Sequence, residues 1–403
     1  MIPSVSFIAI VGLIVGHGLI GLAVLSRFHA LGLNPKWTNR AEVLPLAIPA
    51  IIALGFVWLI VSQRFDAWPW FAQDYAYGCT GVALAFPFIV LARRLRGQPK
   101  GVSGGRVETV LIAKESINAG WIGEGKHAWM LRLPGNESLA FQMADWDLAH
   151  PSLPARFGPL RILHISDLHF ARCYSQAYFE AVADAASGWD ADLVVFTGDL
   201  LDDDATIDWT LPVLGKLRGR LGQYAILGNH DVLHRPGRVR RAIRSAGFDV
   251  IDGRWARIVD GDRSIAIGGT SFPWGPQLDP HQRPDADATI VLSHTPDRFP
   301  SLARWGTVDL VLSGHNHGGQ VRLPLIGPLV MPSLYGCRYD REFFRRGRTV
   351  LEVTQGIGGK HPLRYGCPPE VVRLVLRPSV AASSRAGSSR VRRMSDSTSR
   401  TSL

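Results

Sequence analysis

Short apolar strands limit how this 403-residue chain can fold more than any other feature of its sequence. Strands that are apolar along their whole length are typical of sheets buried on both faces, which predicts an α/β fold in layers. Two stretches among them, residues 177–187 and 238–246, are expected to form helices. The expected strands are Leu160–Ile165, Leu193–Phe196, Tyr224–Leu227, Ile265–Ile267, Thr289–Leu292 and Leu310–Leu312.

Candidate metal ligands directly follow most of these strands. In α/β sheets, sites gather at the carboxyl ends of strands, so these side chains are expected to meet at one edge. A set of oxygen and imidazole ligands without cysteine suits two divalent ions close together, the arrangement that cleaves phosphate esters. Imidazoles favour Mn, Fe, Zn, Co or Ni over Mg or Ca. The candidates are Asp167, His169, Asp199, Asn229, His294, His315 and His317.

The motifs around these residues, Asp-Leu-His, Gly-Asp, Gly-Asn-His-Asp, Ser-His and Gly-His-Asn-His, resemble in kind and order those of the calcineurin-like metallophosphoesterases. Three further segments, Gly314–Gln320, Pro332–Gly336 and Pro362–Glu370, resemble the membrane-attached bacterial branch of that family. The resemblance covers residues 160–376 and implies a layered β-sandwich flanked by helices. It also implies that Asp167, His169 and His317 hold one metal, that Asn229, His294 and His315 hold the other, and that Asp199 bridges both.

The two residues after Asn229 are expected to act in catalysis. The resemblance implies that His230 stabilises the phosphoryl oxygens or protonates the leaving alkoxide, a role that suits imidazole near neutral pH. Asp231 is expected to orient His230 and sustain its charge. The acidic run 202–204 is expected to be a solvated loop rather than a third metal site. Lys360 and Arg364 could either contact substrate phosphate or remain solvated.

Three apolar stretches in the first 92 residues are long enough to cross a bilayer, which takes about 20 residues. They span residues 5–25, 43–61 and 75–92 and predict three transmembrane helices in the region 1–96. Basic residues are concentrated in the first connector and after the third stretch, and the positive-inside rule places both on the cytoplasmic side. The chain is thus expected to be a multi-pass inner-membrane protein with a cytoplasmic catalytic domain.

The remaining sequence is expected to form a linker (97–106), a phosphoesterase domain (107–376, with its motif core at 160–376) and a tail (377–403). Two more strands are expected at Val107–Ala113 and Trp129–Leu133. The tail is rich in Ser and Arg and has no aromatic residue, which predicts disorder. A solvated tail is favoured over one that binds acidic lipid or nucleic acid. Four widely spaced cysteines argue against disulfides or a thiolate zinc site and fit a reducing compartment: Cys79, Cys173, Cys337 and Cys367.

These features predict a membrane-anchored dimetal phosphoesterase that hydrolyses a phosphodiester, phosphomonoester or pyrophosphate bond with metal-activated water. Anchoring favours an amphiphilic substrate, and the resemblance suggests UDP-2,3-diacylglucosamine. One alternative is a non-enzymatic membrane sensor or scaffold, against which the complete ligand set argues. Another is a phosphodiesterase for soluble nucleotides or nucleic acid. Because no basic patch is interleaved with aromatic residues, dedicated nucleic-acid binding is not expected.

Overall fold

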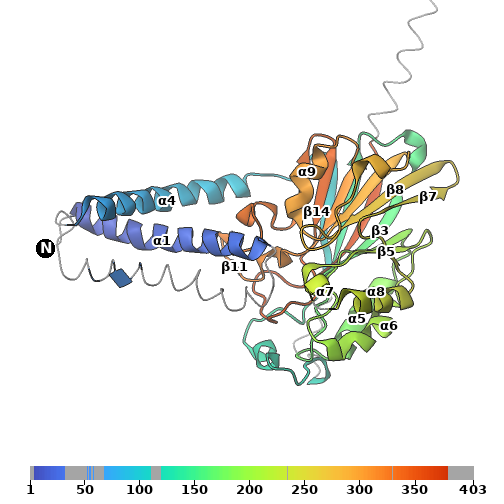
Figure 1. Ribbon diagram of the computed structural model, residues 1–403, viewed down its shortest axis with the longest axis horizontal. Coiled ribbons are helices and arrows are strands. Elements are labelled where there is room, and N and C mark those ends of the chain that lie inside the picture. Colours follow the sequence, from blue (N-terminus) through green and yellow to red (C-terminus); the bar gives the residue numbers. More distant parts are fainter. Residues whose placement is uncertain are drawn as a thin grey trace, which may run out of the picture.

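The computed structural model describes residues 4–31, 52, 54–55, 58, 68–109, 119–233, 235–328 and 330–379. A globular part contains two packed sheets with helices on their outer faces, and an arm of two long helices projects from it (Figure 1). The arm consists of α1 (Ser4–Ala30) and α4 (Trp70–Arg94).

Two sheets form the centre of the globular part. The first has the strand order β1 (Val102–Thr109), β2 (Gln142–His150), β15 (Glu370–Pro378), β3 (Leu160–Ile165), β4 (Leu193–Phe196), β5 (Gln223–Ala225), β6 (Asp249–Val250). The second has the order β13 (Glu342–Arg346), β14 (Thr349–Val353), β10 (Leu310–Ser313), β9 (Ala288–Ser293), β8 (Arg263–Thr270), β7 (Trp255–Asp260). A separate hairpin pairs β11 (Arg322–Leu323) with β12 (Gly327–Pro328).

Parallel pairing directs the strand ends towards one edge. Strands β3, β4, β5 and β6 are parallel to one another in the first sheet. Strands β8, β9, β10 and β14 are parallel in the second. Because parallel strands end on the same side, the residues that follow β3, β4, β5, β9 and β10 lie at one rim of the sandwich.

The central strands are buried on both faces, as their apolar sequences require. In β3, Ile162 packs between the two sheets, whereas Leu163 packs against the helices outside the first sheet. Burial of such a side chain contributes about 1.5–3 kcal/mol. Between the sheets, His164 of β3 also contacts the Glu352 carboxylate of β14 at 2.6 Å and the Thr197 hydroxyl at 2.8 Å. This buried polar contact links the two sheets.

Helices cover the outer faces of both sheets (Figure 1). Helices α5 (Gln176–Ser187), α6 (Thr210–Leu214) and α8 (Pro236–Ser245) pack on the first sheet, and α9 (Phe299–Ala303) packs on the second. In α8, Val239 and Ile243 are one turn apart and both fully buried, so a single apolar stripe attaches the helix. The layered α/β fold and the two expected helices are therefore confirmed, and all six expected strands are present, although the third ends at Ala225 rather than Leu227.

Two local predictions were wrong. Strand β1 begins at Val102, inside the segment expected to be a linker, because its backbone pairs with β2 from Val102 to Thr109 despite the adjacent glycines. Residues 110–113 of the expected strand lie outside the described residues. The expected strand Trp129–Leu133 is a 3-10 helix over Ala128–Arg132. That short apolar run buries Leu131 while Trp129 stays exposed, and it does not pair with a sheet.

The arm supplies two helices that are long and apolar enough to cross a membrane, Ile10–Ala30 within α1 and Trp70–Arg94. They correspond to two of the three expected spans, and the span expected at 43–61 lies outside the described residues. The two helices pack so closely that a Cβ atom at Gly16 would lie 1.9 Å from the Cys79 carbonyl oxygen. Only glycine fits at this position. Small residues that allow such approach are typical of helix pairs in membranes.

Both arm helices meet the globular part near their carboxyl ends. In α1, the Ser26 hydroxyl accepts a hydrogen bond from the Met331 amide at 3.2 Å. Just after α4, the Arg96 guanidinium lies 3.7 Å from the centre of the Phe344 ring. Both helices of the arm therefore contact the globular part directly.

Candidate metal centre

The backbone at the rim of the sandwich is unusual at the candidate ligands. In the described part of the chain, eight residues other than glycine have a positive φ, and five of them are candidate ligands. Each such residue costs on the order of 1–3 kcal/mol, and this strain concentrates at functional sites. The five are Asp167 (54°), His169 (44°), Asp199 (57°), His315 (66°) and His317 (47°).

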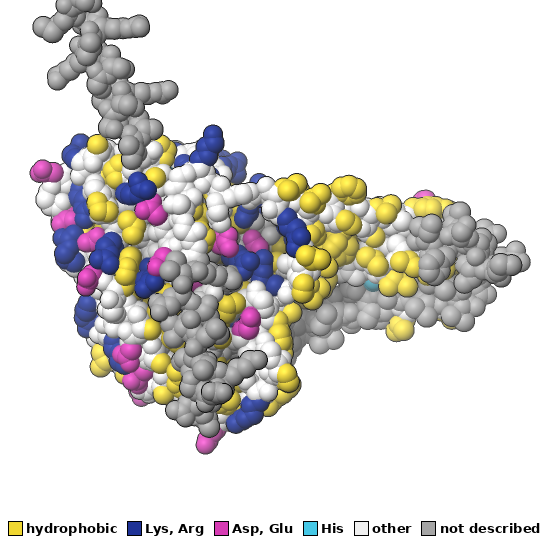
Figure 2. Space-filling model, turned by 180° about the vertical axis from the view of Figure 1, so that it is seen from behind, with side chains coloured by type: hydrophobic (Ala, Val, Ile, Leu, Met, Phe, Trp, Pro, Cys, Tyr) yellow, Lys and Arg dark blue, Asp and Glu magenta, His cyan; other side chains and the backbone are white. Residues whose placement is uncertain are grey.

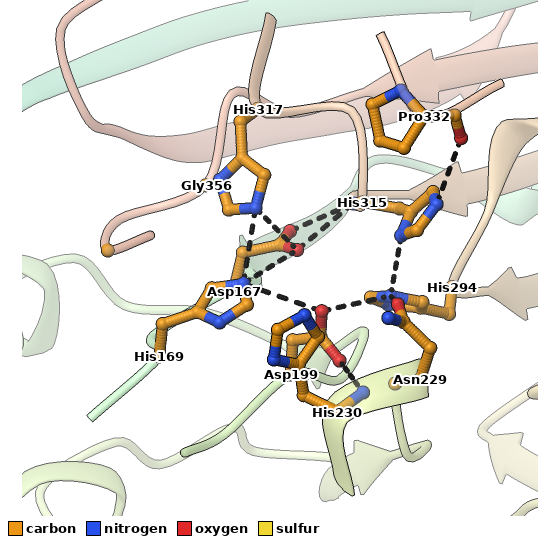
Figure 3. A network of polar contacts seen from close by, with 12 residues as sticks. Asp167, His169, Asp199, Asn229, His230, His294, His315, His317, Pro332 and Gly356 are labelled. Atoms are coloured by element: carbon orange, nitrogen blue, oxygen red, sulfur yellow. Dashed lines mark hydrogen bonds and ion pairs between the residues drawn. The ribbon is translucent and has the colours of Figure 1, made fainter. Parts of the chain in front are cut away.

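All seven candidate ligands come together (Figure 3). Besides a group of His169, Asp202 and His230, six of the candidates form two groups that could each hold a metal ion. In one group, His169 Nε2 lies 3.1 Å from His317 Nε2, and His317 Nε2 lies 3.6 Å from Asp167 Oδ1. In the other, His294 Nε2 lies 3.1 Å from His315 Nδ1 and 2.9 Å from Asn229 Oδ1. The polar atoms of each group thus face a common point.

Asp199 lies between the two groups. One of its carboxylate oxygens, Oδ2, is 3.4 Å from His169 Nε2 and 3.3 Å from His294 Nε2. The other, Oδ1, accepts a hydrogen bond from the His230 amide at 2.9 Å. A carboxylate in this position can offer one oxygen to both groups.

Hydrogen bonds from the far side of three imidazoles fit them for metal binding. His294 Nδ1 lies 2.8 Å from the Thr197 carbonyl, and His315 Nε2 lies 3.0 Å from the Pro332 carbonyl, so each of these nitrogens donates. When both rings are neutral, as metal-bound histidines are, the facing nitrogens His294 Nε2 and His315 Nδ1 carry the lone pairs. In the first group, His169 Nδ1 lies 3.1 Å from Asp202 Oδ2 in the same way. Such outer partners fix the tautomer of metal-bound histidines.

Electrostatics at the site also suits a cation. Burial, with the charge of the nearby His294, lowers the pKa of His315 to about 3, so its ring is neutral near pH 7, as a metal ligand must be. Burial opposes protonation of His294, but the Asp199 carboxylate outweighs it and raises the pKa of His294 to about 9. The Asp199 carboxylate therefore stabilises a positive charge beside His294. A bound metal ion would supply that charge in place of the proton.

Gly314 allows the two sheets to bring their ligands close together. A Cβ atom at this position would lie 2.1 Å from both Asp167 Oδ2 and the Ser166 hydroxyl. The next residue, His315, donates its backbone amide to the two Asp167 carboxylate oxygens at 3.1 and 3.0 Å. The glycine before the first histidine of Gly-His-Asn-His thus makes room for a carboxylate from β3.

Asp202 lies at the candidate site, although the acidic run that contains it was expected to be a solvated loop. Its carboxylate contacts His169 Nδ1 through Oδ2 and His230 Nδ1 through Oδ1. The contact expected between Asp231 and the His230 ring is made by Asp202 instead. Asp231 is fully buried and accepts hydrogen bonds from the Leu200 and Gly228 amides, both at 2.9 Å. Asp231 therefore shapes the loop, and Asp202 orients the ring.

Arg364 is not the solvated side chain that was one of its two expected states, since it is 1% exposed. Its guanidinium donates to the Gln355, Cys367 and Gly358 carbonyls and lies 3.2 Å from His317 Nδ1. It thus supports the loop that carries His317. Lys360, in contrast, is exposed and lines the cavity at the site.

Asp202→Asn should lower metal affinity or activity by about 10–100-fold, the usual effect of losing an outer partner of a metal ligand. The amide cannot serve as a charged acceptor for both His169 and His230. Metal titration of the purified protein, followed by turnover at saturating metal, would separate the two effects. Asp203→Asn is the matched control, because Asp203 pairs with Arg172 at the surface. Equal behaviour of the two variants would contradict a role for Asp202.

A cavity of about 510 Å³ opens over the ligands. Its lining includes His169, Asp199 and His230 together with Met331 and Pro332. The arm contributes to the lining as well, through Leu22 and His29 of α1. A helix that could cross a membrane therefore forms part of the wall of the candidate catalytic site.

Comparisons with known proteins agree with this site. The model of the calcineurin-like phosphoesterase family matches residues 160–319. An uncharacterised metallophosphoesterase of Bacillus subtilis, YkuE, is 30% identical over 56% of this chain and 82% of that protein. The phosphodiesterase YaeI of Escherichia coli is 30% identical over 54% of this chain and 82% of its own length. The UDP-2,3-diacylglucosamine pyrophosphatase LpxG of Chlamydia trachomatis is 26% identical over 56% of this chain and 86% of LpxG.

The fold and the His/Asp groups define a metal-dependent hydrolase of phosphoric esters. The chain belongs to the calcineurin-like metallophosphoesterases. All seven candidate ligands lie within the span of residues that matches the family.

Proposed function

We propose that this protein is a membrane-anchored dimetal phosphoesterase that acts on an amphiphilic phosphate ester or pyrophosphate at the bilayer surface. The observation that carries the proposal is the composition of the cavity wall. Leu22 of α1 and the His230 ring line the same space of about 510 Å³. A substrate with an apolar tail could lie along the arm while its phosphate reaches the ligands.

In this proposal Asp167, His169 and His317 hold one ion, Asn229, His294 and His315 hold the other, and Asp199 bridges them. The chemistry that two divalent ions would supply there is polarisation of the phosphate and a lowered pKa for a bound water molecule. This ligand set is compatible with Mn, Fe, Zn, Co or Ni. Neutral Asn229 adds an oxygen without adding negative charge, which keeps the site attractive to a phosphate anion.

His230 is the proposed general acid. Asp202 contacts its Nδ1, which leaves Nε2 for the oxygen of the leaving group. Burial alone would lower the pKa of His230, but the carboxylates of Asp202 and Asp199 outweigh it and raise this pKa to about 10. The ring is therefore charged near neutral pH, and it can stabilise the phosphoryl oxygens before it gives up its proton.

The proposed location is the inner membrane, with the catalytic domain in the cytoplasm. Arg93, Arg94 and Arg96 follow the apolar part of α4, as expected at a cytoplasmic membrane face. Both arm helices meet the catalytic domain at their carboxyl ends. Two spans that leave the bilayer on the same side require one further crossing between them, which is the position of the expected span 43–61.

A substrate panel tests the proposed substrate class. With Mn added, the purified full chain should hydrolyse UDP-2,3-diacylglucosamine, the substrate named for LpxG, with a higher kcat/KM than bis-p-nitrophenyl phosphate or cyclic nucleotides. Leu22→Ser should raise KM for the amphiphile roughly tenfold, equivalent to about 1.4 kcal/mol of lost apolar contact, and leave the soluble diester unaffected.

Val24→Ser is the matched control, because Val24 lies on the exposed side of the same helix. A higher kcat/KM for a soluble diester, with no selective effect of Leu22→Ser, would favour a phosphodiesterase of soluble substrates. Absence of turnover on every substrate by metal-loaded protein would favour a sensor or scaffold.

A further inference from the structure

A second cavity, of about 520 Å³, lies where α4 meets the catalytic domain. We propose that it binds the headgroup of an anionic phospholipid, separately from the catalytic cavity. The proposal rests on the membrane anchoring that is part of the proposed function. The two cavities share no lining residue among those described. A ligand in the second cavity would therefore occupy a site that the hydrolytic reaction does not use.

The charge of this cavity is strongly positive. Its lining includes six arginines and two carboxylates, and both carboxylates already have partners. Asp340 lies 3.0 Å from the Arg322 guanidinium, and Glu342 lies 3.7 Å from that of Arg341. The other four arginines form no ion pair with a described residue and are all exposed: Arg93, Arg94, Arg96 and Arg338.

Two of these arginines are held in place by aromatic rings. The Arg96 guanidinium lies over Phe344 at 3.7 Å, and that of Arg338 lies 5.5 Å from the centre of the Tyr339 ring. Arg96 also donates to the Arg338 carbonyl at 3.4 Å. Such contacts restrict the side chains before a ligand arrives, so less freedom is lost when they bind a phosphate.

A role in orienting α4 in the membrane would account for only some of the six arginines that line the cavity. Arg93 and Arg94 end a candidate span and Arg96 follows it, a position where basic residues set topology. Arg322, Arg338 and Arg341 come from the catalytic domain, more than 200 residues away in the chain, yet they line the same cavity. Their convergence is a property of the tertiary structure and indicates a binding site for an anion.

Apolar side chains beside the arginines point to a lipid rather than a soluble anion. The hairpin of β11 and β12 places Leu323 and Leu325 at 40% and 71% exposure on the cavity wall. Val90 of α4 lines the cavity as well. In Figure 2, dark blue side chains lie where the yellow arm joins the globular part. Arginines beside apolar groups at the end of a candidate span suit a phosphate with acyl chains, as basic pockets beside membrane helices do.

Native mass spectrometry of the detergent-purified full chain tests this proposal. Phosphatidylglycerol should bind at least tenfold more tightly than phosphatidylcholine with the same acyl chains. An Arg94→Gln/Arg338→Gln double variant should weaken phosphatidylglycerol binding by roughly 10- to 30-fold. Arg241→Gln/Arg244→Gln, on the exposed face of α8, removes the same charge elsewhere and should bind like the unmodified protein.

Two further measurements make the result decisive. Hydrolysis of bis-p-nitrophenyl phosphate by the double variant should be unchanged, which shows that it is folded. An excess of sn-glycerol 3-phosphate should not displace the lipid. Equal binding of both lipids by the unmodified protein, equal loss in the two double variants, or displacement by glycerol phosphate would overturn the proposal.

Discussion

Asparagine in place of Asp199 should remove bound metal and phosphoesterase activity together. Asp199 Oδ2 lies within 3.4 Å of a histidine nitrogen from each ligand group, so one neutral amide would weaken both metal positions. Replacing an outer partner of a metal ligand costs about 10–100-fold in affinity or activity. Loss of a carboxylate proposed to bridge two ions should exceed that range.

Metal analysis by plasma mass spectrometry and turnover of bis-p-nitrophenyl phosphate would measure both effects on the same preparation. Asp204→Asn is the matched control, since that carboxylate pairs with Arg235 at the surface. The prediction fails if active protein carries fewer than two ions per chain, or if Asp199→Asn retains near-normal turnover.

Glutamine in place of His230 should lower kcat by about 10²–10⁴-fold, the range for loss of a general acid, and leave the metal content unchanged. The His230 ring contacts Asp202 and lines the catalytic cavity, whereas the seven proposed ligands form the metal groups. Gln keeps a polar side chain of similar reach but cannot deliver a proton. A change in kcat with little change in KM would distinguish this role from substrate binding.

The metal content and steady-state kinetics of His281→Gln provide the comparison, because His281 is exposed and remote from the cavity. If His230→Gln loses metal in proportion to activity, His230 is a ligand or a structural residue. A leaving group of low pKa, such as p-nitrophenolate, should be affected less than an alkoxide, since it needs less help from an acid.

Short-range sequence was sufficient to predict that the candidate metal ligands lie close together. Asp167 and His169 follow β3 within four residues, and His315 and His317 follow β10 as closely. Since the carboxyl ends of parallel strands meet at one edge, the position of a ligand in the chain determines its position in space. Glycine at 314 was visible in the motif, although its function, to make room for Asp167, required the coordinates of both sheets.

Prediction was poorer where backbone pairing with a distant strand overrides local composition. β1 contains Gly104 and Gly105 and looked like a linker, but it pairs with β2 about 40 residues later. β15 lies between β2 and β3 although it is the last strand of the domain. The sequence of residues 370–378 does not indicate that this strand pairs with β2 and β3.

Contacts between distant segments determine which residues support the candidate ligands and line the cavity. Asp202 stood in an acidic run that looks solvated, but folding places it against His169, 33 residues earlier, and His230, 28 residues later. Arg364 was buried beneath His317 for the same reason. The catalytic cavity also takes Leu22 from α1, more than 140 residues before the first ligand. Short motifs predict the chemistry of the site because the candidate ligands lie close to strand ends. Contacts between distant segments depend instead on how the sheets and helices pack. No short stretch of sequence encodes that packing.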